Sequence, residues 1–215
     1  WQRSEVYGNQ GMDTGIGGSG SSGRIRYSAV FLSPDRGPGK CKARQDPEDG
    51  RHGLLLSLVE GKAAWGFINK NPLKEKGFAS GCTDIEDGWK NMLAIRELIA
   101  NTDLLWSNLP AFSWCKDLGP GWYLPAQKEL ESIWNFGRSN PAYSYKEHKE
   151  AIENLNLRLA EYGQPELGRM RDYWNSTEAD AKRAHILVFT NAPFKSYTKG
   201  TEKFAERFVR AVHKF

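Results

Sequence analysis

The sequence lacks the residue spacings that would assign a metal site or a membrane anchor. Its 215 residues include three cysteines and four histidines, scattered without a C-x-x-C pair or any other metal-ligand spacing. Cys41, Cys82 and Cys115 permit one disulfide with a free thiol, or three thiols. No run of about 18 apolar residues is present, so the sequence predicts no membrane-spanning helix.

Basic charge is also limited. The 30 basic and 26 acidic residues leave a formal net charge of +4, and the basic residues are spread along the chain. One looser group lies near the C-terminus: Lys195, Lys199, Lys203, Arg207, Arg210 and Lys214. A solvated face explains such a group better than a phosphate-binding surface does. The charge pattern therefore argues against a nucleic-acid partner.

Signatures of catalysis are missing as well. Residues 8–24 are rich in Gly and Ser, but they lack the Lys-Ser/Thr pair of a phosphate-binding loop and no apolar strand precedes them. No G-x-S-x-G nucleophile elbow occurs in the chain. Glu129 and Glu131 are two positions apart in a predicted helix, so they point in different directions. We expect a protein that is not an enzyme.

The residues that are present predict a globular domain behind a leader. Hydrophobic residues make up 39% and charged residues 26%, which is typical of globular proteins. Residues 8–24 carry almost no large apolar side chains, so they cannot bury enough surface to offset the entropy of ordering. We predict a flexible leader over residues 1–24 and one domain over residues 25–215.

Residue periodicity predicts an α+β fold. Three segments have apolar residues at helical spacing. They are residues 88–102, with Met92, Ile95, Leu98 and Ile99; residues 125–134, with Leu130, Ile133 and Trp134; and residues 146–163, with Ile152, Leu155 and Leu159 before Gly163. Predicted strands cover residues 24–33, 54–60, 172–178, 184–190, 193–200 and 207–215. Helices followed by an antiparallel run of strands favour α+β over a doubly wound α/β fold.

The second predicted helix has an unusual start. Pro125 suits the first turn, because its missing N–H has no intrahelical partner there. Glu129 lies three residues after Ala126, at which Ser or Thr would complete a capping box. Compared with Ser, Ala at this position predicts a helix start that is weaker by about 0.5–2 kcal/mol.

Six motifs resemble, in the same order, those of a bacterial family of C-type-lectin-like domains, common in secreted and surface proteins of gut Bacteroidetes. They are GLLLSLVE at 53–60, DGWKN at 87–91, LPAFSWC at 109–115, GWYLPAQKEL at 121–130, YWNSTE at 173–178 and FVRAVHKF at 208–215. The formylglycine-generating and diversity-generating-retroelement variable proteins share this fold. The resemblance implies a loop-rich C-type-lectin-like fold, with helices packed against short antiparallel strands. Departures from the pattern are Ala126, Asn175 and His213, where Ser or Thr, Ser and Arg are usual.

The resemblance gives the aromatic segment 121–134 a structural role. In the family this stretch belongs to the core, with Trp122 and Leu124 leading into a helix whose Leu130 packs inward. We therefore expect core packing here. The alternative is that Tyr123 or Trp134 contacts a ligand.

The resemblance also places a binding surface in residues 179–207, where Ala184, Leu187 and Phe189 match the buried positions. The residues expected to form the ligand surface, with Trp174 as its support, are Trp174, Asp180, Lys182, Arg183, His185, Thr190, Asn191, Lys195 and Tyr197. They are not enriched in Asn and Tyr, so we expect no diversified copy. The alternative is a solvated sheet edge whose charges prevent strand pairing.

A calcium site is a weaker alternative. Residues 163–168 and 174–176 are similar to the Q-P-D and W-N-D elements of calcium-dependent animal lectins, in which carboxylates and amides surround the cation. Glu166 and Ser176 each replace an Asp, which leaves fewer hard oxygen ligands. We expect a Gln-Pro turn here and no cofactor; a calcium site would use Gln164, Glu166 and Asn175.

The resemblance implies a non-enzymatic, exported protein at the cell surface or outside the cell, with any signal or lipid anchor outside this sequence. Its expected partner is a glycan or a protein, bound through the C-terminal sheet and loops in adhesion. One alternative is a structural or tip subunit of a fimbrial, pilus or other surface assembly. Another is an enzyme on an oxidase-like scaffold, although the paired cysteines of such an oxidase are missing after Cys115.

Overall fold

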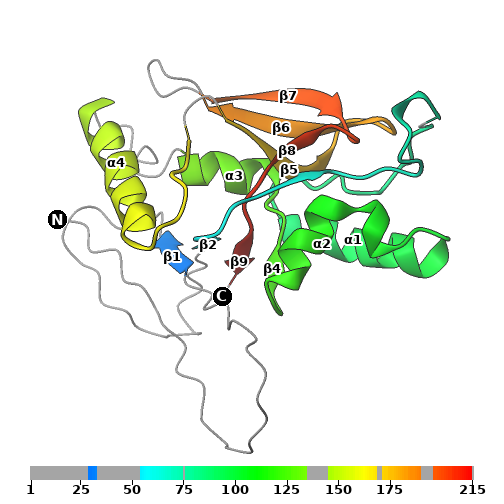
Figure 1. Cartoon of the computed structure of the whole chain (residues 1–215), viewed down its shortest axis with the longest axis horizontal. Coiled ribbons are helices and arrows are strands. Elements are labelled where there is room, and N and C mark those ends of the chain that lie inside the picture. Colours follow the sequence, from blue (N-terminus) through cyan, green and yellow to red (C-terminus); the bar gives the residue numbers. More distant parts are fainter. Residues whose placement is uncertain are drawn as a thin grey trace, which may run out of the picture.

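Nine strands form two sheets in the computed structural model, which describes residues 29–32, 54–74, 76–134, 145–168, 171–189 and 196–214 (Figure 1). The strands are β1 Ala29–Leu32, β2 Leu54–Ser57, β3 Gly61–Ala64, β4 Trp122–Tyr123, β5 Asp172–Glu178, β6 Arg183–Phe189, β7 Ser196–Glu202, β8 Glu206–Val209 and β9 Val212–Lys214. The smaller sheet has the order β1-β2-β9-β4 and the larger one β3-β8-β5-β6-β7. The predicted leader lies outside the described residues.

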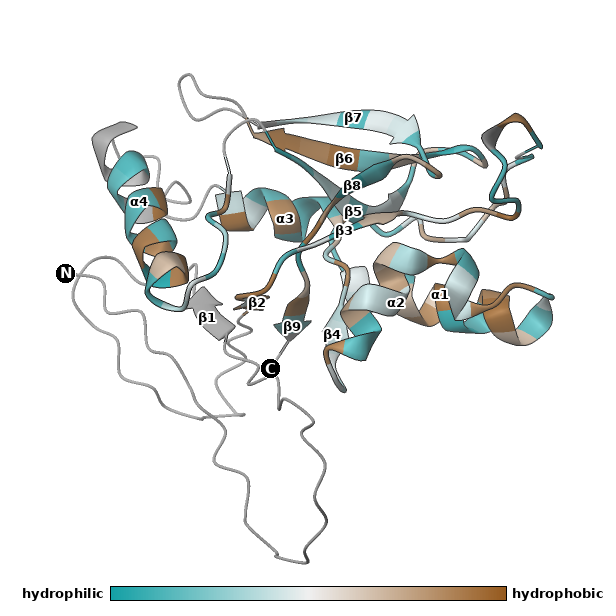
Figure 2. Ribbon diagram, in the orientation of Figure 1, coloured by the Kyte–Doolittle hydropathy of each residue, from teal (hydrophilic) through white to brown (hydrophobic). Residues whose placement is uncertain are grey.

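The described residues also form four α-helices and two 3₁₀ helices. They are η1 Pro72–Lys74, α1 Gly88–Asn101, η2 Trp106–Asn108, α2 Pro110–Asp117, α3 Gln127–Trp134 and α4 Tyr145–Glu161. Helix α1 packs on β5, α2 on β3, and α3 on β6. Hydrophobic residues run along β6 and recur on α3 and α1 (Figure 2). The α+β prediction is therefore confirmed, with antiparallel pairing throughout except for one parallel pair, Tyr173 with Phe208.

The three predicted helices form, and their apolar faces pack inward. Met92 and Ile95 of α1 are fully buried, as the spacing predicts. The side chain of Asp87 caps this helix by accepting hydrogen bonds from the N–H groups of Trp89 and Lys90. Helix α4 ends before Gly163, whose φ of 64° is the left-handed conformation that favours Gly after a helix. Helix α2 was not predicted, because its apolar residues follow one another almost without interruption from Ala111 to Cys115 and leave no polar face from which to read a helical period.

Helix α3 starts without a capping hydroxyl, and tertiary partners replace it. The N–H of Gln127 donates to the hydroxyl of Thr177 at 3.3 Å, and that of Lys128 donates to the carbonyl of Ile85 at 2.8 Å. The Glu129 carboxylate accepts from the N–H of Ala126 at 2.8 Å, which is the other half of a capping box. The predicted weakness at Ala126 is thus offset by β5 and by the segment before α1.

The motif residues meet in the core. Glu129 is almost fully buried and also accepts from the Tyr123 hydroxyl at 2.8 Å and from the N–H of Gly88 at 3.0 Å. Asn91 of α1 donates to the Ser176 hydroxyl of β5 at 2.9 Å. The D-G-W-K-N, G-W-Y-L-P and Y-W-N-S-T-E motifs are therefore parts of one buried hydrogen-bond network.

Most of the aromatic segment 121–134 lies in the core, as expected, whereas Trp122 is only partly buried. Tyr123, Leu124 and Trp134 have no exposed surface, and the Trp134 ring stacks on that of Phe189 with centroids 4.0 Å apart. A ligand-contacting role for Tyr123 or Trp134 is inconsistent with this burial.

The segment predicted as one strand at 207–215 is two strands in different sheets. β8 ends at Val209 and β9 begins at Val212, with Arg210 buried between them. The Arg210 guanidinium donates to the carbonyl of Pro165 at 2.8 Å and pairs with the Glu60 carboxylate at 3.1 Å. A buried guanidinium needs such partners, so the chain leaves one sheet here before joining the other.

Candidate functional site

The turn between β5 and β6 carries three residues of the predicted ligand surface. The Asp180 carboxylate accepts hydrogen bonds from the main-chain N–H groups of Lys182 at 2.9 Å and Arg183 at 2.8 Å. The Arg183 side chain donates to the same carboxylate at 2.7 Å, which lowers the pKa of Asp180. Asp180 and Arg183 therefore shape the turn and offset each other's charge, while Lys182 is exposed to solvent.

Tyr197 belongs to the same sheet but lies far from this turn. It is 53% exposed and pairs with Val188, whereas Arg183 pairs with Glu202. Five strand positions separate the two pairs, or about 17 Å. Because that number is odd, Tyr197 and Arg183 also lie on opposite faces of the sheet. The predicted surface is therefore divided between two places.

Two further predicted residues point into the protein. Trp174 is fully buried, and its indole N–H donates to the carbonyl of Ala63 at 3.0 Å. This corrects the expectation that Trp174 contacts a ligand: β5 is an inner strand, contacted by both α1 and α3. His185 is half-buried, and burial lowers the pKa of its imidazole. Thr190, Asn191 and Lys195 lie outside the described residues.

A buried ion pair lies below the β5–β6 turn. The Lys203 ammonium contacts the Glu178 carboxylate and donates to the carbonyls of Phe78 at 2.6 Å and Ala181 at 3.2 Å. Its nitrogen also lies 4.8 Å from the centroid of the Trp65 ring. Burial lowers the pKa of Lys203, and the Glu178 carboxylate opposes this shift. Sequence analysis placed Lys203 in a solvated basic group; its contacts with distant carbonyls could not be read from the local sequence.

The described cysteines are buried thiols. Cys82 lies beside this ion pair, and burial raises the pKa of its thiol to about 12. Cys115 is also buried and free, with a pKa raised by the same cause. Thiols with such pKa values are poor nucleophiles at neutral pH. Cys41 lies outside the described residues.

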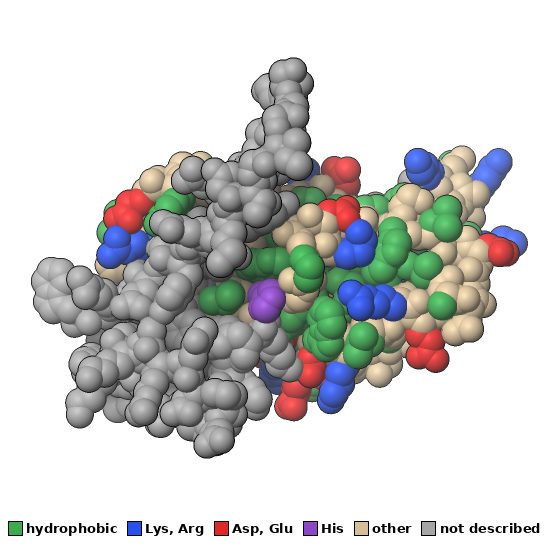
Figure 3. Space-filling view, turned by 90° about the horizontal axis from the view of Figure 1, so that it is seen from below, with side chains coloured by type: hydrophobic (Ala, Val, Ile, Leu, Met, Phe, Trp, Pro, Cys, Tyr) green, Lys and Arg blue, Asp and Glu red, His purple; other side chains and the backbone are tan. Residues whose placement is uncertain are grey.

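The smaller sheet has an aromatic outer face that sequence analysis missed. Leu55 pairs with His213, and His213 pairs with Trp122, so the three side chains form one row across β2, β9 and β4. All three are partly exposed. The Trp122 and His213 rings pack edge to face, with their centroids 5.6 Å apart. Gly121 allows this contact, because a Cβ there would lie 2.2 Å from Nε2 of His213. The alternation of inward and outward side chains along these strands was the sequence signal that could have predicted this face. The underside of the molecule displays hydrophobic side chains bordered by basic ones (Figure 3).

Two of the residues proposed for a calcium site, Asn175 and Glu166, differ in burial and do not form one site. Asn175 is fully buried, and its side-chain oxygen accepts from the N–H of Thr177 at 3.0 Å. Glu166 is exposed on the segment after α4. Within the described ranges, no group of three or more His, Cys, Asp or Glu side chains is placed to hold a metal ion. In the same part of the chain, no helix is both long enough and apolar enough to cross a membrane.

Comparison with known proteins identifies the fold. No protein-family model matches the chain, and no curated protein matches it in sequence. Among solved structures, a fimbrial protein from Bacteroides ovatus ATCC 8483 has a similar structure, with a TM-score of 0.57 and 16% sequence identity over 87% of this chain. The match spans 44% of that protein's chain. The chain thus shares its fold with part of a fimbrial protein.

Proposed function

We propose that this chain is a domain of a structural or tip subunit in a fimbrial assembly at the bacterial surface. The fold shared with the Bacteroides ovatus fimbrial protein over 87% of the chain carries the proposal. Because the match covers 44% of that protein, the proposal concerns the role of one domain within a larger subunit. An exported, surface-exposed location follows from the same proposal.

An open sheet edge supports an assembly role. β7 is the last strand of the larger sheet and pairs with β6 through all seven of its residues. Among the described strands, none pairs with its other side. Within the described residues, this leaves one row of main-chain N–H and C=O groups for contact with another subunit.

We also propose that the domain belongs to the C-type-lectin-like family and acts by binding, without catalysis and without a cofactor. The family proposal is supported by the motif residues Asn91, Glu129 and Ser176, which join three distant motifs in one network. The proposal that the domain acts without catalysis is supported by the burial of Cys82, Cys115, Tyr123 and Tyr173, which raises the pKa of each side chain and keeps it protonated.

The assembly proposal is tested on surface filaments of the source organism. Filaments are sheared from cells, separated by size, and probed with an antibody against the domain by immunoblotting and immunogold electron microscopy. We expect the chain in the filament fraction and gold label along or at the tip of filaments. A strain in which the gene is deleted serves as the control. Recovery of the chain solely as a free protein or in the cell interior would contradict the proposal.

Ligand binding by the exposed turn and β7 is a second candidate function, favoured by the exposure of Lys182 and Tyr197. A glycan array with calcium and with chelator tests it. Binding that persists in chelator supports a calcium-free surface, and binding lost in chelator supports the calcium alternative. For any ligand found, Lys182→Ala with Tyr197→Ala should weaken binding, whereas the control pair Lys128→Ala with Tyr162→Ala should not. Equal binding by both variants would exclude both the turn and β7 as the binding site.

A further inference from the structure

A loop between β3 and α1, residues 67–78, projects from one end of the molecule (Figure 1). Both of its ends are pinned. The N–H of Phe67 donates to the carbonyl of Asn108 at 2.8 Å, and the side-chain amide of Asn108 donates to the carbonyl of Phe67 at 3.1 Å. At the other end the N–H of Phe78 donates to the carbonyl of Ala181 at 2.8 Å. The loop therefore starts and ends on the body of the domain.

The tip of this loop is an ordered turn that holds an apolar side chain in solvent. The side chain of Asn69 accepts from the N–H of Asn71 at 2.9 Å, and the side chain of Asn71 accepts from the N–H of Leu73 at 3.0 Å. A further main-chain bond, from Lys74 to Asn71 at 2.9 Å, closes η1. Leu73 is 95% exposed on this turn, the largest value among the exposed hydrophobic residues of the described chain. Ile68, at the start of the loop, is 49% exposed.

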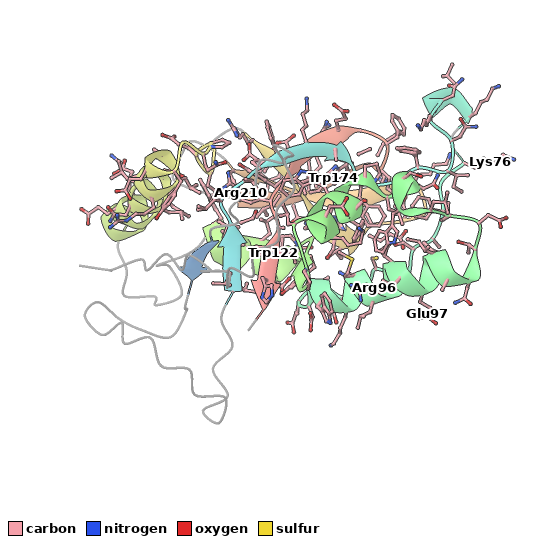
Figure 4. All side chains as sticks on the ribbon, turned by 60° about the horizontal axis from the view of Figure 1, so that its bottom comes forward. Lys76, Arg96, Glu97, Trp122, Trp174 and Arg210 are labelled. Atoms are coloured by element: carbon pink, nitrogen blue, oxygen red, sulfur yellow. The ribbon has the colours of Figure 1, made fainter. Side chains whose placement is uncertain are left out.

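Three exposed lysines lie within three residues of Leu73 in the sequence. They are Lys70, Lys74 and Lys76, and the side chain of Lys76 points away from the body of the domain (Figure 4). By sequence, Glu75 is the one acidic residue of the segment. Lys182 adds to this charge, because its side chain lies against Gly77 at the base of the loop. Basic side chains project from the same end of the molecule in the view from below (Figure 3).

We propose that the loop 67–78 is a contact site for an anionic lipid surface. Leu73 and Ile68 would enter the boundary between headgroups and acyl chains, and the lysines would lie at the level of the phosphates. The residue types favour lipid over a protein partner. Protein interfaces are enriched in Arg and aromatic residues and depleted in Lys, whereas residues 68–76, between the anchoring Phe67 and Phe78, include three lysines, no Arg and no aromatic residue. Lysine is a compact point charge that suits a fluid anionic surface without fixed geometry.

This inference rests on the loop alone and does not depend on the fimbrial proposal. Flotation with lipid vesicles tests it on the whole chain, with phosphatidylcholine vesicles compared with vesicles containing about 30% phosphatidylglycerol, at about 0.1 M and about 0.5 M NaCl. We expect the wild-type chain to float with the anionic vesicles at low salt, and to be released by the higher salt or by omission of the anionic lipid.

Loop variants then separate a local site from overall charge. K70Q/K74Q/K76Q should lower partitioning by about tenfold or more, since each lysine near the surface contributes about fivefold. The control K62Q/K90Q/K128Q removes the same charge at exposed lysines elsewhere and should keep most of the binding. Leu73→Ser should lower partitioning several-fold at unchanged charge. Its control, Leu157→Ser, changes a leucine that is 62% exposed on α4.

The outcomes are decisive in either direction. Thermal melting checks that each variant is folded, which we expect because every substituted side chain is exposed. Selective loss in the two loop variants supports the proposal. Absence of wild-type flotation with anionic vesicles, or equal losses in the loop and control variants, would overturn it. Failure here would leave the filament experiment unaffected.

Discussion

Lys203 and Glu178 form an ion pair below the β5–β6 turn, with side-chain exposures of 4% and 9%. The pair connects the segment after β7 to the end of β5, and its hydrogen bonds reach the carbonyls of Phe78 and Ala181. The β5–β6 turn and the base of the loop 67–78 are thus both hydrogen-bonded to one ammonium group. Substitution of either residue therefore tests how much this ion pair stabilises the end of the larger sheet.

Replacing Lys203 with Met should destabilise the fold strongly. The substitution leaves the Glu178 carboxylate buried without its cation, and removal of one partner of a buried pair costs about 3–5 kcal/mol. Urea denaturation at neutral pH measures the change in the free energy of unfolding. Lys62→Met is the control, because its pair with Glu206 is exposed and 3.9 Å long; it should change stability by less than about 1 kcal/mol. Similar effects for the two variants would contradict the structural role.

Replacing Glu129 with Ala should break the network that joins the motifs. The substitution removes the acceptor of the Tyr123 hydroxyl and of the N–H groups of Gly88 and Ala126. Buried donors without partners cost about 1–3 kcal/mol each, so we expect a loss of about 3 kcal/mol or more in the free energy of unfolding. Glu97→Ala, at an exposed position of α1, should cost less than about 1 kcal/mol in the same titration. A mild effect at Glu129 would argue against the network.

Restoring the usual capping residue should bring little benefit. Ala126→Ser adds a hydroxyl at the start of α3, but the N–H groups of Gln127 and Lys128 already donate to Thr177 and Ile85. We therefore expect a gain below about 0.5 kcal/mol, less than for an ordinary N-cap replacement. Chemical denaturation of the two proteins provides the measurement. A gain near 2 kcal/mol would show that the tertiary bonds do not substitute for a cap.

His185 should make the fold less stable in mild acid. Burial lowers the pKa of its imidazole below the ordinary 6.5, and the nearby Arg183 lowers it further while Asp180 opposes the shift. Between the two pKa values the unfolded chain binds more protons than the folded one, so the free energy of unfolding falls as the pH drops below about 6.5. His185→Gln should reduce this dependence when unfolding is followed across the range. An unchanged pH profile would exclude His185 as a source.

Local sequence determined much of the framework. The 3.6-residue spacing of Met92 and Ile95 predicted α1, because that period alone places both side chains on one buried face. The strand at 172–178 and the buried aromatic segment before α3 were likewise readable. Helix α2 was missed, since its apolar residues run almost uninterrupted from Ala111 to Cys115, whereas the equally short α3 shows a helical period in Leu130, Ile133 and Trp134.

The tertiary structure decided where the exposed residues lie. Strand register separates Tyr197 from Arg183, and the inner position of β5 buries Trp174. Both features depend on how strands pair in space, so local sequence could not predict them. Arg210 lies at the break in the last predicted strand, and local spacing could not predict that break, because the partner of Arg210, Glu60, lies 150 positions earlier. A sequence records the period of each element through local spacing. Which face of a strand is covered depends on contacts between distant segments, and these are fixed when the chain folds.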